Sequence, residues 1–308
     1  MKNLNVLIFH RLIDENEEKH ELIPNTNSQN FYETIKRLKK FYKFTTPEKY
    51  LKRELTKKKF LKNISVTFDD GYKDNFLFAL PIFKQMNIPA TFFVSSGFLN
   101  GGWMWNDGII EAISKTSKVQ LDLTSIGFER FPLYTAAEKI SCINDLISRI
   151  KYLETRTRVD MAKRILELAS VAEPVHLMMT DEQVKEMHRA GMEIGGHTVN
   201  HPILKSADKA TARREIFENK EYLESLIGEP IKSFAYPNGK PGKDYGPEHV
   251  ALVKEAGYKC AVSTAWGRVN MGSDPFQLPR FTPWDRNPWK FILRLWLLPH
   301  EKGGRLEC

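Results

Sequence analysis

Short hydrophobic segments alternate along the chain with longer segments in which apolar residues recur every three or four positions. The short segments are typical of buried strands, and they lie at residues 4–9, 64–68, 90–95, 192–196, 232–236 and 258–263. The longer segments predict helices, of which 74–86, 206–227 and 247–256 are the clearest. Thr46 and Thr180 stand where the N-cap residues of two further helices are expected. Strands and helices that alternate in this way predict a largely parallel sheet with helices around it.

The segment from residue 97 to about residue 179 interrupts this alternation. It contains an aromatic stretch with Trp103 and Trp105, followed by helical patterns over 135–153 and 159–171. No linker rich in Ser, Gly or Pro flanks the segment, so we interpret it as a helical insertion between two core strands. The two tryptophans could stack on sugar rings, or they could pack within the insertion.

Two of the predicted strands end in residues with metal-ligand chemistry. Asp69 and Asp70 follow the second strand, and His197 and His201 follow the fourth. A pair of glycines precedes His197 and a proline follows His201, so the histidines belong to a loop and not to a helix. Two imidazoles and one carboxylate offer three ligands to a divalent cation, and the other carboxylate is left as a base. The sequence therefore predicts an open hydrolytic metal site.

Two other strands also end in polar or aromatic residues. His10 follows the first strand, and Tyr236 and Pro237 follow the fifth. The carboxyl ends of parallel strands share one rim, where ligands and catalytic groups gather in α/β proteins. This placement predicts a (β/α) barrel whose rim brings these residues together. His10 could donate a proton there, or it could be a hydrogen-bonded core histidine.

Composition limits the class of protein further. The chain has 308 residues, of which 42% are hydrophobic and 27% are charged, as is usual for a soluble globular protein with a sizeable core. The first apolar run is too short for a signal peptide, and no stretch reaches the ~18 apolar residues that span a membrane. Cys142, Cys260 and Cys308 lack the spacing of a metal site. These features predict a protein of the reducing cytoplasm.

The net charge of +8 favours an anionic partner. Much of the excess positive charge lies over residues 36–62 and in the C-terminal tail. A membrane surface, a nucleotide-sugar or a lipid diphosphate fits this charge, although solvated helix faces would also explain it. No nucleic-acid-binding module is visible. Residues 287–308 resemble a basic amphipathic helix at a membrane interface, with a last helix that covers the barrel as the alternative.

Three segments resemble the motifs of the polysaccharide deacetylases, the NodB-homology group also called carbohydrate esterase family 4. They are Thr67-Phe68-Asp69-Asp70-Gly71, His197-Thr198-Val199-Asn200-His201 and Ser233-Phe234-Ala235-Tyr236-Pro237-Asn238-Gly239, the last in the family's Phe-Ala-Tyr-Pro variant. The resemblance implies an irregular, seven-stranded (β/α) barrel over residues 1–286. The insertion would lie at about 97–179, and 287–308 would form a C-terminal basic amphipathic helix and tail.

The resemblance also implies roles for individual residues. Asp70, His197 and His201 would bind a divalent metal, for which zinc is the best match to two imidazoles and a carboxylate. Asp69 would be the general base. The substrate would be an N-acetylated amino sugar. Tyr236, Pro237 and Asn238 would line the substrate and oxyanion site, where a backbone N–H near Asn238 would bind the oxyanion together with the metal.

Two departures from the family pattern concern catalysis. The arginine that positions the base in the common third motif is absent. Arg280 could replace it by gripping the Asp69 carboxylate through two nitrogens, or it could be a surface arginine that follows a strand. The family's final motif, Leu-x-His with a histidine general acid, has no clean match. His300 lies in the extreme tail, so His10 on the catalytic rim is our candidate for the acid.

These features predict a cytoplasmic, metal-dependent hydrolase that removes an N-acetyl group from an amino sugar in bacterial surface polysaccharide biosynthesis. The lack of an export signal favours a sugar carried on a nucleotide or a lipid at the inner membrane face. One alternative is the hydrolysis of another amide, such as a formamide or a cyclic amide, on the same scaffold. The other is a non-catalytic carbohydrate-binding protein, which would not need a base beside a metal.

Overall fold

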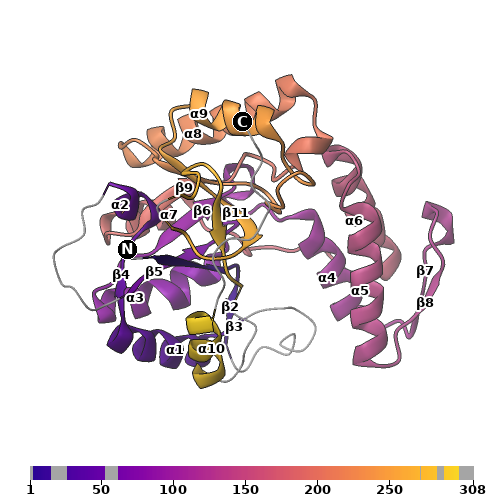
Figure 1. The fold of residues 1–308 in the computed structure, drawn as a ribbon. Coiled ribbons are helices and arrows are strands. Elements are labelled where there is room, and N and C mark those ends of the chain that lie inside the picture. The colour runs from indigo at the N-terminus through magenta and orange to yellow at the C-terminus, as the bar shows by residue number, and fades with distance from the viewer. Residues whose placement is uncertain (1–2, 15–25, 53–61, 271, 283–287, 298–308) are drawn as a thin grey trace.

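The centre of the fold is a sheet of parallel strands that curls into a ring (Figure 1). The computed structural model describes residues 3–14, 26–52, 62–270, 272–282 and 288–297. The ring order is β1 (Leu4–Phe9), β5 (Lys62–Phe68), β6 (Thr91–Val94), β9 (Glu193–Gly196), β10 (Ser233–Ala235), β11 (Cys260–Trp266) and β12 (Leu278–Arg280). A parallel bridge between Leu7 and Phe281 brings the last strand back to the first. The prediction of an irregular, seven-stranded (β/α) barrel is confirmed.

Short strands and helices complete the barrel. β4 (Tyr42–Phe44) pairs with the start of β5, and β2 (Leu12–Ile13) pairs with β3 (Thr26–Asn27) outside the ring. The helices that pack around the ring are α1 (Ser28–Phe41), α2 (Pro47–Leu51), α3 (Leu80–Met86), α7 (Asp181–Arg189), α8 (Lys209–Ile227), α9 (Pro247–Glu255) and α10 (Pro288–Leu297). Thr46 and Thr180 cap α2 and α7 through their side chains, as expected. The predicted helix over 74–86 is a π-helical turn at Asn75–Ala79 followed by α3.

Alternation along β5 separates the outer core from the barrel interior. Ile64, Val66 and Phe68 are fully buried in the core under the helices. Phe68 also stacks on Phe92 of β6, with 5.1 Å between the ring centroids. Because successive side chains of a strand point to opposite faces, the next residue, Asp69, points to the barrel side. Core packing thus fixes the direction of a site residue.

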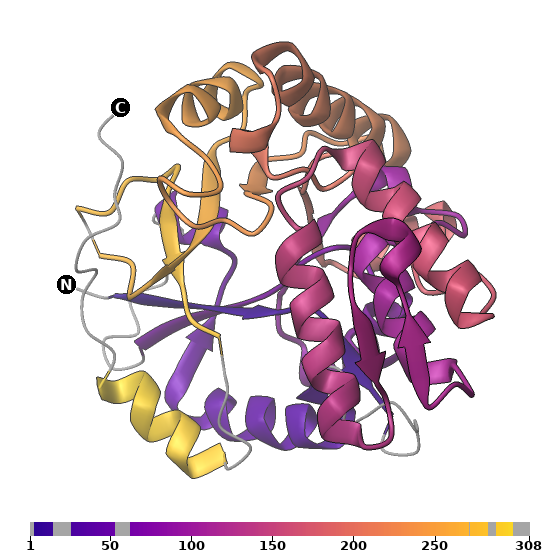
Figure 2. The same cartoon turned by 90° about the vertical axis from the view of Figure 1, so that its right-hand side faces the viewer.

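The insertion between β6 and β9 forms a compact unit on one side of the barrel (Figure 2). It contains α4 (Trp105–Lys115), α5 (Ala136–Ile150) and α6 (Thr155–Ala169), as well as an antiparallel hairpin that the sequence did not predict, β7 (Gln120–Asp122) with β8 (Arg130–Pro132). A second hydrophobic cluster, which includes Ile109, Leu146 and Ile165, holds these elements together.

None of the helices in the described part of the chain has the length and apolar character that a membrane span requires. The predicted boundary before residue 287 falls in the 283–287 segment, outside the described residues. The division of the chain into domains therefore stays a prediction.

Candidate metal centre and active site

The carboxyl ends of the barrel strands bring together residues that are far apart in the sequence. His10 follows β1, Asp69 and Asp70 follow β5, His197 follows β9, and Arg280 ends β12. Because the paired barrel strands are parallel, their carboxyl ends bring these side chains to one rim. The rim predicted from the sequence is present.

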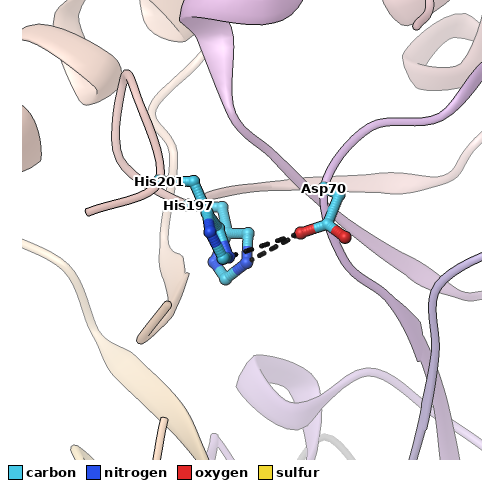
Figure 3. A group of neighbouring side chains, drawn as sticks. All are labelled: Asp70, His197 and His201. Atoms are coloured by element: carbon cyan, nitrogen blue, oxygen red, sulfur yellow. Dashed lines mark ion pairs between the residues drawn. The ribbon is translucent and has the colours of Figure 1, made fainter. Parts of the chain in front are cut away.

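Asp70, His197 and His201 form a compact group of potential metal ligands (Figure 3). The Nε2 atoms of His197 and His201 lie 3.3 Å and 3.5 Å from Asp70 Oδ1. One ligand atom from each residue lies within 4.8 Å of the others. A cation with bonds of about 2.0–2.2 Å has tetrahedral ligands roughly 3.4 Å apart, so the distances of the two Nε2 atoms from Asp70 Oδ1 suit such an ion.

Two features of the surroundings also fit a cation. The Nδ1 atom of His197 lies 2.7 Å from the Ala235 carbonyl oxygen, which can only accept a hydrogen bond. Nδ1 therefore carries the proton, and Nε2 is left as the ligand atom. Asp70 Oδ1 is buried and forms no hydrogen bond with a described residue. A cation would satisfy this oxygen, which is otherwise unfavourable to bury.

Burial and neighbouring charges set the protonation of these ligands. Burial alone would raise the pKa of Asp70, but the contacts with His197 and His201 hold it well below its usual range. Burial lowers the pKa of His201 to about 3, and the positive charge of Arg158 adds to this effect. Asp70 is therefore ionised and His201 neutral near pH 7, as metal ligands must be.

Arg280 grips Asp69 through two parallel hydrogen bonds. Nη1 donates to Oδ1 and Nη2 to Oδ2, each at 2.7 Å. Arg280 also donates from Nε to the Ser263 carbonyl at 2.9 Å and from Nη1 to Thr67 Oγ1 at 3.2 Å. Burial would raise the pKa of Asp69, but the Arg280 guanidinium, with smaller contributions from His197 and His10, outweighs this effect and holds the pKa below its usual value. The expected two-nitrogen contact is present, and Arg280 is 1% exposed, so it is not a surface arginine.

His10 lies on the rim as an exposed side chain. Its charge helps to lower the pKa of both Asp69 and Asp70, which places it close to the two carboxylates. This exposed position differs from that of a buried core histidine. A role in proton donation stays a prediction.

A hydrogen-bond network that the sequence did not predict fixes the segment that carries His10. Asn75 donates from Nδ2 to the His10 carbonyl at 2.9 Å. Asp74 accepts from the Leu12 N–H at 3.1 Å and from Arg11 Nε at 2.7 Å. Asp74 and Asn75 follow the Asp69-Asp70 pair closely. The segment after β5 therefore supplies these two carboxylates and also the side chains that hold the backbone around His10.

The third motif has one side chain in the core and one backbone group near the rim. Tyr236 stacks on Tyr245 with 3.8 Å between the ring centroids and donates its hydroxyl to the Phe276 carbonyl at 3.1 Å, so its side chain points into the core. Pro237 is buried as well. Asn238 adopts a positive φ of 56°, and its N–H forms no hydrogen bond with a described residue. Of the three, Asn238 retains a donor for a substrate oxygen.

The two tryptophans of the insertion make contacts within it. Trp105 is 6% exposed, belongs to the hydrophobic cluster of the insertion and lies 5.5 Å from the Arg158 guanidinium. Trp103 is half-buried and donates from Nε1 to Glu173 at 3.1 Å. This is the packing that the sequence left as an alternative. Sugar stacking by either ring stays a prediction.

The insertion approaches the site through two buried residues that sequence reasoning missed. Arg158 on α6 is 1% exposed, and its Nη2 lies 3.5 Å from the His201 carbonyl oxygen. Asp107 on α4 accepts from the Tyr72 hydroxyl at 3.0 Å, and burial raises the pKa of its carboxyl to about 6. Both lie in helical segments with no motif around them, so only the folded chain reveals them.

Comparison with known proteins agrees with this geometry. The family model described as polysaccharide deacetylase matches residues 56–261. Among curated proteins, the chain is 26% identical over 102 residues to the putative polysaccharide deacetylase YxkH of Bacillus subtilis, which covers 33% of this chain and 35% of that protein. It is 27% identical over 134 residues to a poly-beta-1,6-N-acetyl-D-glucosamine N-deacetylase of Staphylococcus aureus, with 41% and 44% covered. The match thus spans less than half of these curated relatives.

Solved structures share the fold over nearly the whole chain. The Streptococcus pyogenes deacetylase PplD has a TM-score of 0.62 at 21% identity, with 94% of this chain and 97% of that chain covered. IcaB from Ammonifex degensii has a TM-score of 0.60 at 18% identity, with 96% and 97% covered. Since the family model covers two thirds of the sequence, the chain belongs to the polysaccharide deacetylase family.

Proposed function

We propose that the protein is a metal-dependent hydrolase that removes the N-acetyl group from an amino sugar used in bacterial surface polysaccharides. The observation that carries this proposal is the pairing of two carboxylates with different partners. Asp69 is held by Arg280, while Asp70 faces His197 and His201. This difference supports Asp70 as the proposed metal ligand and Asp69 as the proposed proton acceptor.

Asp70, His197 and His201 would hold the metal, and zinc suits their chemistry. When bound, such an ion polarises a carbonyl group and lowers the pKa of a bound water. Asp69 is kept ionised by Arg280, so it can accept a proton from the attacking water. The fork of Arg280 fixes the direction of the Asp69 oxygens and so the path of that proton.

Two further groups would act on the reacting amide. The Asn238 N–H, which has no partner among the described residues, would donate to the oxyanion. His10 would protonate the leaving amine, a role supported by its exposed position after β1 on the same rim. Asp74 and Asn75 would hold His10 at the required position.

The relatives narrow the substrate class that we propose. One of them is named for the N-deacetylation of poly-beta-1,6-N-acetyl-D-glucosamine. For this chain we propose a sugar of similar chemistry, carried on a nucleotide or a lipid at the cytoplasmic face of the membrane. Another amide on the same scaffold is the alternative substrate. A protein that only binds sugar would not need the buried Asp69–Arg280 pair, so this pair favours an enzyme.

Acetate release from a panel of nucleotide-linked, lipid-linked and polymeric N-acetyl sugars tests the proposal. Wild-type protein loaded with zinc should release acetate from at least one member, and Asp69→Asn protein should not. Release of formate or ring opening of a cyclic amide, without acetate release, would favour the alternative substrate. Sugar binding with no hydrolysis by the metal-loaded protein would refute the enzymatic proposal.

We also propose that α10 contacts an anionic membrane surface. Phe291 and Leu295 of this helix pack inward, whereas Leu293 and Leu297 are 61% and 73% exposed beside the exposed Arg294. Exposed leucines next to a cation suit an interface with anionic lipids. Wild-type protein should co-sediment with vesicles that contain anionic lipid, and a Leu293→Asp/Leu297→Asp variant should bind less. Equal sedimentation of the two proteins would contradict the assignment.

A further inference from the structure

The loop that carries the two histidines, residues 197–201, contains backbone conformations that its own residues do not favour. We call it the metal loop. Thr198 has a φ of 65° and His201 has a φ of 49°. The left-handed region is unfavourable for a β-branched residue such as threonine. Conformations of this kind persist only where the surrounding structure holds them.

Glu215 of α8 lies behind the metal loop and accepts three hydrogen bonds from it. Its Oε2 accepts from the N–H groups of Val199 at 2.9 Å and Asn200 at 2.7 Å. Its Oε1 accepts from Nδ2 of Asn200 at 2.8 Å. Glu215 is 7% exposed, so these donors satisfy a carboxylate that is largely removed from water. These three hydrogen bonds hold the turn between His197 and His201.

Asn219 stands one helical turn after Glu215 and holds the other end of the metal loop. Its Oδ1 accepts from the His197 N–H at 3.0 Å. Its Nδ2 donates to the Val94 carbonyl at 3.0 Å and to Ser96 Oγ at 2.9 Å. Residues four apart on a helix share one face, so Glu215 and Asn219 act from the same side. Asn219 therefore ties the first histidine to the end of β6.

The residues after β6 complete the support. Gly97 donates its N–H to the Val199 carbonyl at 2.9 Å, and Ser95 donates its hydroxyl to the His197 carbonyl at 2.9 Å. There is little room for adjustment, since a Cβ added at Gly97 would lie 2.8 Å from the Val199 carbonyl oxygen. The metal loop is thus fixed from α8 on one side and from the end of β6 on the other.

We propose that Glu215 and Asn219 are positioning residues that hold the metal loop in its metal-binding conformation before the ion arrives. This inference rests on the proposed metal-dependent function. Neither side chain touches a ligand atom, and both act through the backbone between His197 and His201. Residues that orient metal ligands from behind typically change metal affinity about 10–100-fold when they are replaced. We expect the same kind of effect on metal affinity from Glu215 and Asn219, which lie on the neighbouring helix α8.

The chain offers a matched control for Glu215. Glu224 lies on the same helix and accepts a backbone N–H, that of Ile231 at 2.9 Å. That bond supports the connection from α8 to β10 and not the metal loop. Glu215→Gln and Glu224→Gln therefore remove one negative charge each and weaken a similar bond, but only the first acts on the histidines.

The test measures the zinc affinity of the full-length apoproteins by competition with a chromophoric chelator at fixed pH. Glu215→Gln should weaken zinc binding at least ~10-fold, the lower end for residues that support ligands. Glu224→Gln should bind zinc as tightly as the wild type. Asn200→Ala removes one bond to Glu215 from the exposed side of the loop and should weaken binding about threefold, as expected for a single hydrogen bond. This third variant leaves α8 intact, so it tests the proposal even if Glu215→Gln fails to fold.

Turnover at saturating zinc provides a second readout. If Glu215 acts only through metal binding, Glu215→Gln should regain most of its activity when zinc is saturating, whereas Asp69→Asn should not. Equal zinc affinity in the wild type, Glu215→Gln and Asn200→Ala would overturn the inference and leave the proposed function intact. Equal weakening in Glu215→Gln and Glu224→Gln would also overturn it, because the effect would then be general. A wild-type protein that binds no divalent ion would refute both.

Discussion

Removal of the Arg280 guanidinium should destabilise the fold and slow the reaction together. Arg280→Met leaves the Asp69 carboxylate 3% exposed and without its two hydrogen bonds of 2.7 Å. Loss of one partner of a buried ion pair destabilises proteins by about 3–5 kcal/mol, because the remaining charge stays buried. The substitution also leaves the Ser263 carbonyl and the Thr67 hydroxyl without this donor. We therefore expect the free energy of unfolding to fall by about 4 kcal/mol.

Two measurements separate stability from catalysis. Urea denaturation at neutral pH, followed by circular dichroism, gives the free energy of unfolding. Acetate release per folded, zinc-loaded molecule gives the turnover, which should fall at least ~10²-fold because the base loses its orientation. Arg280→Lys should be intermediate in both, since an ammonium supplies the charge without the two-nitrogen fork.

Arg268→Met is the matched control. Arg268 is also a buried arginine, but it donates to Asn5 near the start of β1 and to the Leu295 carbonyl of α10, away from the catalytic rim. This variant should lose stability and keep its turnover per folded molecule within about threefold. If Arg280→Met lost less than about 1 kcal/mol of stability, or kept the wild-type turnover, the view that this pair positions the base would be refuted.

Other variants test the remaining assignments. Asp70→Ala and His201→Ala should abolish stoichiometric zinc binding. Asp69→Asn should keep the metal and lose at least ~10²-fold in turnover. Metal analysis together with acetate release would show if the roles of the two aspartates are reversed. His10→Ala should slow amide hydrolysis more than hydrolysis of an activated ester, whose leaving group needs little protonation, and equal losses would leave His10 without a role as acid. The folded pKa of Asp107, about 6, lies above its ordinary value of 3.8. Protonated Asp107 therefore makes its full contribution to stability below the ordinary pKa, about 3 kcal/mol at most. This contribution is lost as the pH rises through about 6. Asp107→Asn should accordingly flatten the fall in unfolding free energy between about pH 4 and about pH 6, and an unchanged slope there would show that another group is responsible.

The long strands of the barrel could be predicted because both of their faces are buried. A strand of this kind is a continuous hydrophobic run, as in Leu4–Phe9, and turn residues bound it. β4 and β12 have three residues each, and the strands of the β7–β8 hairpin are equally short. β10 also has three residues, but it lies within the predicted segment 232–236, whereas the other short strands lie in no such predicted segment and are defined only by pairing with their neighbours.

Some residues of the site could be predicted from the sequence, and others could not. The proposed metal ligands and the proposed base lie in two compact motifs, so their chemistry could be predicted from the sequence. The absence of the usual motif arginine made Arg280 a candidate partner of Asp69. The supporting residues were not visible, because their contacts join distant parts of the chain. Asn219 contacts a residue 22 positions earlier, and Asn75 contacts one 65 positions earlier. As single polar residues in helical segments, they match no pattern.

The backbone explains how two adjacent carboxylates can face different partners on one rim. If β5 continued regularly, Asp70 would point away from Asp69 and into the core under the helices. Instead, Asp70 has a φ of 79° and Gly71 a φ of 94°, which turns the chain at the end of the strand. Aspartate tolerates the left-handed region better than most residues. Hydrogen bonds from the Ser95 N–H to the Asp70 carbonyl at 3.2 Å and from the Met179 N–H to the Gly71 carbonyl at 3.0 Å hold this turn.

The roles of the two aspartates therefore follow from conformation before any ion is bound. Asp69 keeps the direction of the strand and meets Arg280 across the barrel. Asp70 leaves that direction through a positive φ and meets the histidines. Gly71 is needed at the next position, because its φ suits only glycine and an added Cβ would lie 3.1 Å from Val94 Cγ1. The Asp-Asp-Gly sequence thus separates the proposed base from the proposed metal ligand by means of a turn that a regular strand could not make.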